Sequence, residues 1–196
     1  MEALPVKFSQ TTLTELMIPS YANFGGKIHG GILLSLMDKV AYACASKHAG
    51  AYCVTVSVDE VDFLQPVEVG ELVHLKASVN YVGNTSLVVG IQVTAENVKN
   101  HTIKHTNTSY FTMVAKDDDE NLTQVPPLIL EDMDQIRRFI EAIKRKNLKS
   151  ESRKAMKQVK SNFILVEDFP LLKDQRCQTR LSKDDGELDH LFADNN

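Results

Sequence analysis

The sequence predicts an α+β domain in which an antiparallel sheet of about five strands wraps around one central helix. A long apolar segment with helical spacing is preceded by one strand-like segment and followed by four segments rich in Val, Ile and Thr. A parallel sheet would need several crossover helices, and this part of the chain offers only one. The strands are therefore expected to be antiparallel and to pack on that helix.

The elements follow one another in the order strand, helix, four strands. The first strand is expected at residues 8–18, and the helix at residues 30–47, where apolar residues recur at steps of three and four without a breaker. The later strands are expected at residues 52–64, 71–82, 86–98 and 102–115. Gly83 and Asn84 are expected to form a hairpin turn, since both residue types accept a positive φ.

The density of charge divides the chain near residue 117. Residues 1–117 carry 18 of the 48 charged residues and residues 118–196 carry the other 30, while eight of the nine glycines lie before residue 91. We therefore expect a packed domain at residues 1–117 and a charged C-terminal extension at residues 118–196. The extension is expected to contain a basic helix near residues 132–160 and a looser acidic tail.

The composition excludes several classes of protein. Shares of 43% hydrophobic and 24% charged residues are those of a globular chain, not of a disordered or collagen-like one. A net charge of −4 gives no overall attraction to nucleic acid, and three scattered cysteines are too few for a disulfide framework or a zinc site. The longest apolar stretch, residues 30–37, is too short to span a membrane, and no secretory signal opens the sequence, so we expect a cytoplasmic protein.

Candidate functional residues gather in the loop before the helix and on its first turns. Gly30 and Gly31 would let a ligand approach the free N–H groups of the first turn, which could stabilise an oxyanion, or they could simply serve tight packing. Asp38 lies in an apolar helix, so it is either paired or used, unless it faces solvent beside Lys39. Asn23 could be an ordinary turn residue.

Several segments occur in the order and spacing of one known family. They are the loop at residues 19–31, Leu36-Met37-Asp38 on the helix, residues 54–59 leading to residues 63–67 and Gly70, and residues 82–86. With them the sequence resembles the hotdog-fold acyl-CoA thioesterases, in the acyl-CoA hydrolase branch that includes the brain-type cytosolic enzymes and their short bacterial relatives. The resemblance covers roughly residues 9–117, the whole of the expected packed domain.

The resemblance implies roles for individual residues. Asp38 would be the catalytic carboxylate, acting either as a general base toward water or as a nucleophile that forms a transient anhydride. Asn23 of a partner protomer would orient the water or polarise the thioester. The backbone amides at Gly30 and Gly31 would stabilise the oxyanion, and Thr85 and Ser86 would contact the substrate.

The resemblance also implies a homo-oligomer, because each site would combine residues of two protomers. A dimer is the minimum, and relatives often form hexamers built from three dimers. The reaction would cleave an acyl-CoA to a fatty acid and CoA, with no metal and no redox cofactor. The alternative is a hotdog module that binds acyl-CoA, or regulates, without turnover. Asn23 and Asp38 favour the enzyme, since a binding module has no need of a carboxylate against a neutral thioester.

One departure from the family pattern concerns the CoA phosphates. Many relatives carry an arginine directly after the glycine at position 83, where this chain has Asn84, so one cationic contact is missing. The lysines that could substitute for it are Lys76, Lys99 and Lys104. His29 is expected to be a packing or rim residue, because relatives vary at this position.

The C-terminal extension has a pattern of its own. Asp132 and Gln135 resemble a capping box, and residues 137–160 hold ten Lys or Arg against two Glu. Because interleaved aromatic residues are lacking, we expect a solvated helix against the core or a neighbouring subunit, not a helix that binds nucleic acid or membrane. Residues 163–166 and 169–172 are apolar, and serve either as docking patches on the oligomer or as a partner-binding segment.

Overall fold

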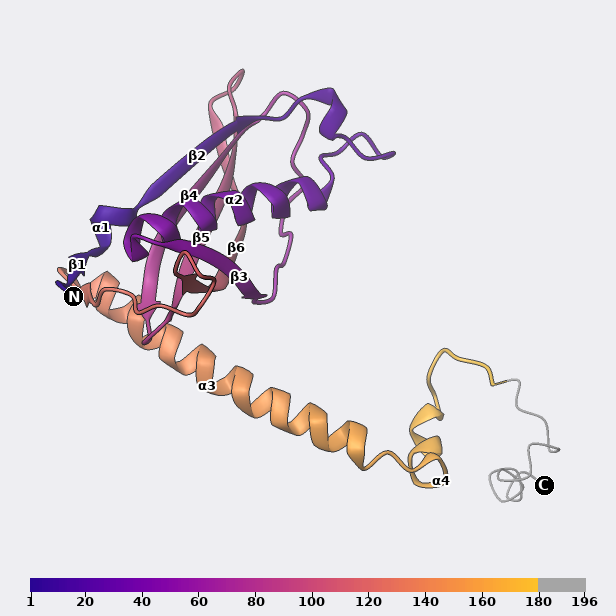
Figure 1. Cartoon of the computed structure of the whole chain (residues 1–196). Helices are drawn as coiled ribbons and strands as arrows, with labels where there is room; N and C mark the ends of the chain where they lie inside the picture. The colour runs from indigo at the N-terminus through magenta and orange to yellow at the C-terminus, as the bar shows by residue number, and fades with distance from the viewer. Residues whose placement is uncertain (180–196) are drawn as a thin grey trace, which may run out of the picture. The chain divides into compact units, whose positions relative to one another are not determined.

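A helix of twenty residues, α2 (Gly30–Ala49), lies across one face of a five-stranded sheet in the computed structural model, which describes residues 1–179 (Figure 1). The strands, in their spatial order, are β2 (Thr11–Leu16), β4 (Leu72–Val82), β5 (Ser86–Asn97), β6 (Thr102–Lys116) and β3 (Tyr52–Val58). Every neighbouring pair in this sheet is antiparallel. The prediction of an antiparallel sheet around one helix is therefore confirmed.

The chain forms two compact units. The first unit, Met1–Lys144, contains the sheet and α2. Its smaller elements are β1 (Leu4–Pro5), α1 (Val6–Ser9), the 3-10 helix η1 (Pro19–Tyr21) and β7 (Leu128–Ile129). The second unit begins at Arg145. Its described part holds the C-terminal portion of helix α3 (Met133–Ser161), followed by α4 (Leu165–Asp168) and the 3-10 helix η2 (Phe169–Leu172).

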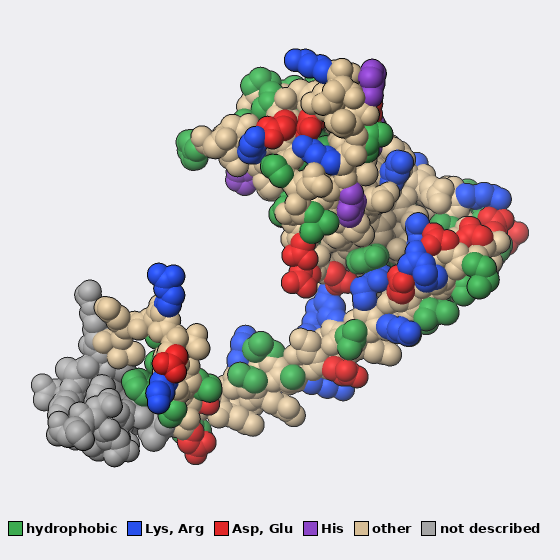
Figure 2. Space-filling view, turned by 180° about the vertical axis from the view of Figure 1, so that it is seen from behind, with side chains coloured by type: hydrophobic (Ala, Val, Ile, Leu, Met, Phe, Trp, Pro, Cys, Tyr) green, Lys and Arg blue, Asp and Glu red, His purple; other side chains and the backbone are tan. Residues whose placement is uncertain are grey.

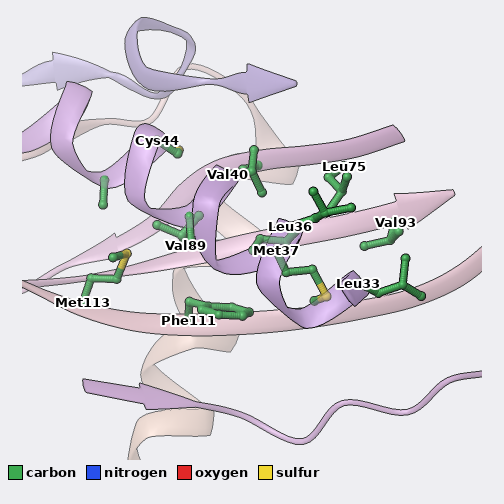
Figure 3. Packing of buried hydrophobic residues seen from close by; sticks show 14 of the residues in the cluster. Leu33, Leu36, Met37, Val40, Cys44, Leu75, Val89, Val93, Phe111 and Met113 are labelled. Atoms are coloured by element: carbon green, nitrogen blue, oxygen red, sulfur yellow. The ribbon is translucent and has the colours of Figure 1, made fainter. Parts of the chain in front are cut away.

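One apolar face of α2 packs on the sheet and forms the core. The helix contributes Leu33, Leu36, Met37, Val40 and Cys44, and the sheet contributes Leu75, Val89, Val93, Phe111 and Met113 (Figure 3). Full burial of each large aliphatic or aromatic side chain stabilises the fold by roughly 1.5–3 kcal/mol. The opposite face of the helix is exposed in the single chain and carries Leu34, Asp38 and Tyr42.

Two strands are shorter than the sequence predicts. The first begins at Thr11 instead of residue 8, because the chain makes one helical turn, α1, directly after Pro5. The strand expected at residues 52–64 ends at Val58, and the residues that follow it include several acidic side chains and Pro66, which are poor strand formers. The bounds predicted for β4, β5 and β6 agree with the structure to within one residue at each end.

The turn between β4 and β5 also differs from the prediction. Neither Gly83 nor Asn84 has a positive φ. Three residues join the two strands, and the Gly83 N–H donates a hydrogen bond to the Ser86 carbonyl at 2.7 Å. A turn closed in this way holds both residues in ordinary backbone conformations, so positive φ is not needed.

The first unit extends beyond residue 117, where the charge density changes. The Asn84 carbonyl accepts a hydrogen bond from the Val125 N–H at 3.0 Å, and the ring centroids of Tyr81 and Phe139 lie 5.0 Å apart. Residues 118–144 therefore pack with the sheet. Whether residues 1–117 fold as a separate domain stays a prediction.

The basic helix of the extension forms close to the predicted position, as α3. The Asp132 carboxylate accepts a hydrogen bond from the Gln135 N–H at 2.8 Å, and the Gln135 side chain accepts one from the Glu131 N–H at 2.9 Å. The predicted cap is therefore confirmed, although the reciprocal bond reaches one residue further back than in a standard capping box.

The surface of the second unit is both basic and apolar. The cationic side chains Arg153, Lys154, Lys157 and Lys160 are exposed on α3, as are Leu148, Met156 and Val159 (Figure 2). None of the helices in residues 1–179 is long and apolar enough to cross a membrane. The same residues contain no cluster of three or more His, Cys, Asp or Glu side chains that could hold a metal ion. The last part of the expected acidic tail lies outside the described residues.

His48, on the last turn of α2, gives the fold a dependence on pH. Its ring is buried, and burial lowers the pKa of His48 below the usual 6.5, while the hydrogen bond of its Nε2 to the Pro126 carbonyl at 3.0 Å opposes part of that shift. Between the folded-state pKa of His48 and pH 6.5 the unfolded chain therefore binds a proton at this residue that the folded chain does not bind.

We expect the free energy of unfolding to fall as the pH is lowered from 7 through 6.5 toward the folded-state pKa of His48. One such group contributes a slope of at most about 1.4 kcal/mol per pH unit. Urea unfolding at a series of pH values measures the slope, and a His48→Gln variant should show a shallower one. Equal slopes for the two proteins would mean that His48 is not responsible.

Candidate active site

Asp38 lies on the exposed face of α2, opposite the strand β3. Its Oδ1 accepts a hydrogen bond from the Thr55 hydroxyl at 2.7 Å. Thr55 belongs to β3, so this bond joins the helix to the edge strand of the sheet. The carboxylate is exposed in the single chain, yet it is held in one orientation by a neighbour, which distinguishes it from a free surface aspartate.

Asp38 also lines a cavity of about 480 Å³ between α2 and β3. The other lining residues are Lys39, Tyr42, Tyr52, Cys53, Val54, Thr55 and Met113. Cys53 and Met113 are buried and belong to the core. The carboxylate thus stands beside a hollow with a largely apolar floor, which is the setting in which a charged group can act on an apolar substrate.

The two elements that form this cavity, and the segment after β3, expose many large apolar side chains. β3 is an edge strand that pairs with β6 alone within residues 1–179, so among these residues no strand pairs with its other edge. The large apolar side chains exposed on α2, on β3 and in the segment after it are Leu34, Tyr42, Tyr52, Val56, Val58, Phe63 and Leu64. An open strand edge beside exposed apolar side chains is typical of a surface that another chain covers.

Asn23 occupies a tight loop that begins and ends with the bridge between Ala22 and Ile28. Its Oδ1 accepts hydrogen bonds from the N–H groups of Gly25, at 2.9 Å, and Lys27, at 3.2 Å. Asn23 therefore acts as a turn residue, as one of the two interpretations expected, and both hydrogen bonds of the turn use its amide oxygen. Within residues 1–179 no hydrogen bond joins Asn23 to Asp38, so the two are not brought together by the fold of one chain.

The start of α2 has a cap that the sequence analysis missed. His29 is the N-cap residue, and its Nδ1 accepts a hydrogen bond from the Gly31 N–H at 2.9 Å. A side chain at Gly31 would meet the same imidazole at 2.9 Å, and one at Gly30 would meet the Phe63 ring at 3.2 Å. The paired glycines therefore allow close packing, and of their two N–H groups the one at Gly31 is committed to His29. The position of His29 directly before the first helical residue was the sequence signal that could have indicated this cap.

Ser86 points to the face of the sheet opposite α2, and Thr85 lies in the turn before β5. Ser86 precedes Leu87, which is buried against α2, so the alternation of side chains along β5 directs Ser86 to the other face. Thr85 lies in the turn, where its carbonyl accepts a hydrogen bond from the Ala115 N–H at 2.9 Å. The fold of one chain therefore does not gather Thr85, Ser86 and Asp38 into one site.

Other reactive side chains of the core are structural. Cys44 and Cys53 are buried free thiols, and burial raises the pKa of Cys44 to about 12, so that thiol stays protonated near neutral pH. Neither cysteine therefore has the reactivity of a nucleophile.

One of the three lysines that could replace the missing arginine is already paired within the chain. The Lys104 ammonium lies 2.9 Å from the Glu71 carboxylate.

Comparisons with known proteins agree with this fold. Residues 25–100 match the Thioesterase superfamily. The chain is 31% identical over 158 residues to a Bacillus subtilis protein named an uncharacterized acyl-CoA thioester hydrolase, YkhA, a match that covers 81% of this chain and 91% of YkhA. The chain belongs to the acyl-CoA thioester hydrolases of the hotdog fold. Protein VdlD of Helicobacter pylori is 45% identical over 138 residues, covering 70% of this chain and 79% of VdlD.

Solved structures of this family resemble the chain over most of its length. An apo-hexameric acyl-CoA thioesterase superimposes with a TM-score of 0.76 and 32% identity, covering 78% of this chain and 98% of the other. An acyl-CoA hydrolase from Staphylococcus aureus, in complex with butyryl coenzyme A and coenzyme A, superimposes with a TM-score of 0.73 and 31% identity, covering 81% and 97%. Hotdog architecture of the first unit is therefore shared with acyl-CoA hydrolases.

Three further structures of the Staphylococcus aureus hydrolase are alanine variants, one at an asparagine, one at an aspartate and one at a threonine. In that protein the aspartate follows the asparagine by 15 positions, and the threonine follows the aspartate by 17. The same intervals separate Asn23, Asp38 and Thr55 in this chain. Thr55 lies within residues 54–59, a segment that carried the family resemblance, but the sequence did not single it out. The hydrogen bond to Asp38 is what marks Thr55 as a candidate site residue.

Proposed function

We propose that the protein hydrolyses the thioester of a fatty acyl-CoA, releasing a free fatty acid and CoA. The observation that carries the proposal is the Asp38 carboxylate, held by Thr55 at the mouth of a cavity with an apolar floor. An acyl chain can lie in such a cavity while its thioester carbon stays beside the carboxylate. Membership of the acyl-CoA thioester hydrolase family supports the same reaction.

In the proposed reaction Asp38 removes a proton from water as the water oxygen attacks the thioester carbon. The carbonyl oxygen gains negative charge, and the Gly30 N–H at the positive end of α2 stabilises it. The carbon–sulfur bond then breaks, and the CoA sulfur takes the proton from Asp38. Direct attack by the carboxylate, followed by hydrolysis of the anhydride, fits the same position. Neither route requires a metal or a redox cofactor.

The second polar group of the proposed site comes from another protomer. Asn23 supplies its amide nitrogen, because the amide oxygen is committed to its own loop. The open edge of β3 and the apolar side chains around Asp38 form the surface on which the partner sits. A dimer is the minimum assembly. Hexamers among similar structures support a trimer of dimers.

The CoA moiety is proposed to contact Thr85 and Ser86 across a subunit boundary, since Ser86 points away from α2 and Asp38 in one chain. Their hydroxyl and backbone groups can donate hydrogen bonds to phosphate oxygens. Nucleic acid and membrane lipid have no part in the proposed reaction. A cytoplasmic location is proposed as well, and relatives named cytosolic acyl coenzyme A thioester hydrolases support it.

Thiol release from acyl-CoA tests this function. We expect the purified protein to release CoA from acyl-CoA continuously, with a chelator present as well as absent. A module that binds acyl-CoA without turnover would instead give saturable binding, measured by calorimetry, and no thiol above the rate without protein. That second result would contradict the enzymatic function and favour the binding module.

Thr55→Val should slow the reaction without abolishing it. A hydrogen bond to a charged group contributes about 1.5–3 kcal/mol, so loss of the bond to Asp38 is expected to lower kcat/KM by about 10- to 100-fold. Thr55→Ser keeps the hydroxyl and serves as the matched control, with activity close to that of the wild type. If the valine and serine variants were equally active, the bond seen at 2.7 Å would have no part in catalysis.

A further inference from the structure

We infer that Tyr42 and Tyr52 form the end wall of the acyl site and select short acyl chains. The inference rests on the proposed thioesterase function and names its substrate class. Tyr42 belongs to α2 and Tyr52 begins β3, and both line the cavity that contains Asp38. Their ring centroids lie 6.0 Å apart, with the ring planes tilted by 60°. The two walls of the cavity therefore meet at an aromatic pair.

The aromatic pair stands at the end of the cavity away from Asp38 and Thr55. From Asp38 to Tyr42 is one helical turn, a rise of about 6 Å. From Thr55 to Tyr52 is three strand residues, about 10 Å. Because carbon–carbon bonds near 1.5 Å meet at angles near 111°, an extended alkyl chain advances about 1.25 Å per carbon, so a span of about 6–10 Å admits an acyl chain of on the order of five to eight carbons.

The lining between the two ends suits an alkyl chain. Cys53 and Met113 form its buried floor, and Val54 lies on its β3 side. The two tyrosines are not buried in the core of one chain, since Tyr42 is 44% exposed and Tyr52 is 55% exposed. In the proposed dimer the partner covers this surface, so the two rings close the end of the cavity between the protomers, where the methyl end of a chain meets them and a longer chain has to displace them.

An aromatic pair can also serve only to join two elements. The first unit contains such a pair, Tyr81 and Phe139, with centroids 5.0 Å apart, and Tyr81 does not line the cavity of Asp38. Removal of the Tyr81 ring therefore disturbs an aromatic pair of the same kind without opening the proposed end wall. Tyr81→Ala is the matched control for loss of packing.

The test is kcat/KM for butyryl-, hexanoyl-, octanoyl-, dodecanoyl- and palmitoyl-CoA. The wild type is expected to prefer the short members. In Tyr42→Ala and in Tyr52→Ala the ratio of kcat/KM for dodecanoyl-CoA to that for butyryl-CoA should rise by about 10-fold or more, because methylenes that the pocket excluded now fit. Tyr42→Phe, which keeps the ring, and Tyr81→Ala should keep the wild-type ratio.

The outcomes distinguish failure of the proposed tyrosine role from failure of the proposed thioesterase function. An active wild type without a preference for short chains, or alanine variants that keep the wild-type ratio, would overturn the role of the tyrosines and leave the thioesterase function in place. A shift in Tyr42→Phe equal to that in Tyr42→Ala would overturn the end wall as well. A wild type that releases no thiol at any chain length would overturn the function itself. Variants from two different elements guard against one that fails to fold.

Discussion

Asp38→Asn is expected to lower kcat by about 10² or more while the fold and the affinity for acyl-CoA are kept. The amide has the shape of the carboxylate, and its oxygen can still accept the hydrogen bond that Thr55 donates at 2.7 Å. What it loses is the ability to take a proton from water or to attack the thioester carbon. Thiol release from a good acyl-CoA substrate measures the loss, and calorimetric titration with CoA measures the affinity.

The control for this variant is Asp118→Asn, which removes an exposed aspartate in the turn after β6, away from the cavity. It should leave kcat within about twofold of the wild type, because isolated surface charges contribute little. Equal rates for the wild type and Asp38→Asn would discard both chemical roles of Asp38. A fall in kcat of the same size in both variants would point to a general loss of folded protein, which unfolding curves would reveal.

The architecture of the first unit could be predicted because it depends on local patterns. Apolar residues at helical spacing lie without a breaker from Gly30, and α2 forms there. β4, β5 and β6 are long β-rich segments bounded by residues that favour turns, so their ends were predictable. The end of β3 was not, because the residues after Val58 still contain apolar side chains whose burial depends on other elements.

The candidate site was predictable only in part, because its geometry is tertiary. Sequence spacing and family resemblance singled out Asp38, but its partner Thr55 lies 17 positions away on another element, and no local pattern pairs them. Helical periodicity alone left open an aspartate that faces solvent, and the side chain is exposed in one chain while being held by Thr55. The cap at His29 similarly uses an atom whose direction depends on how the loop enters α2.

Mixing two inactive variants is expected to restore activity, if each site combines Asp38 of one protomer with Asn23 of its partner. Asn23→Ala keeps Asp38, and Asp38→Ala keeps Asn23. In a mixed dimer one site has both residues and the other has neither. Equal amounts with free exchange give mixed dimers as half of the population, so activity should rise from near zero to about a quarter of the wild-type value.

Subunit exchange must be shown separately, by native mass spectrometry of protomers with different tags, and activity should rise at the rate at which mixed dimers appear. Asp38→Ala mixed with Asp38→Asn is the control, since no pairing of these two contains an intact Asp38. Rescue cannot arise if both residues act within one protomer, because every protomer in the mixture lacks one of them. Complete exchange without any gain in activity would therefore mean that Asn23 and Asp38 of different protomers do not act in one site. The argument that places the site at the open edge of β3 would then fail.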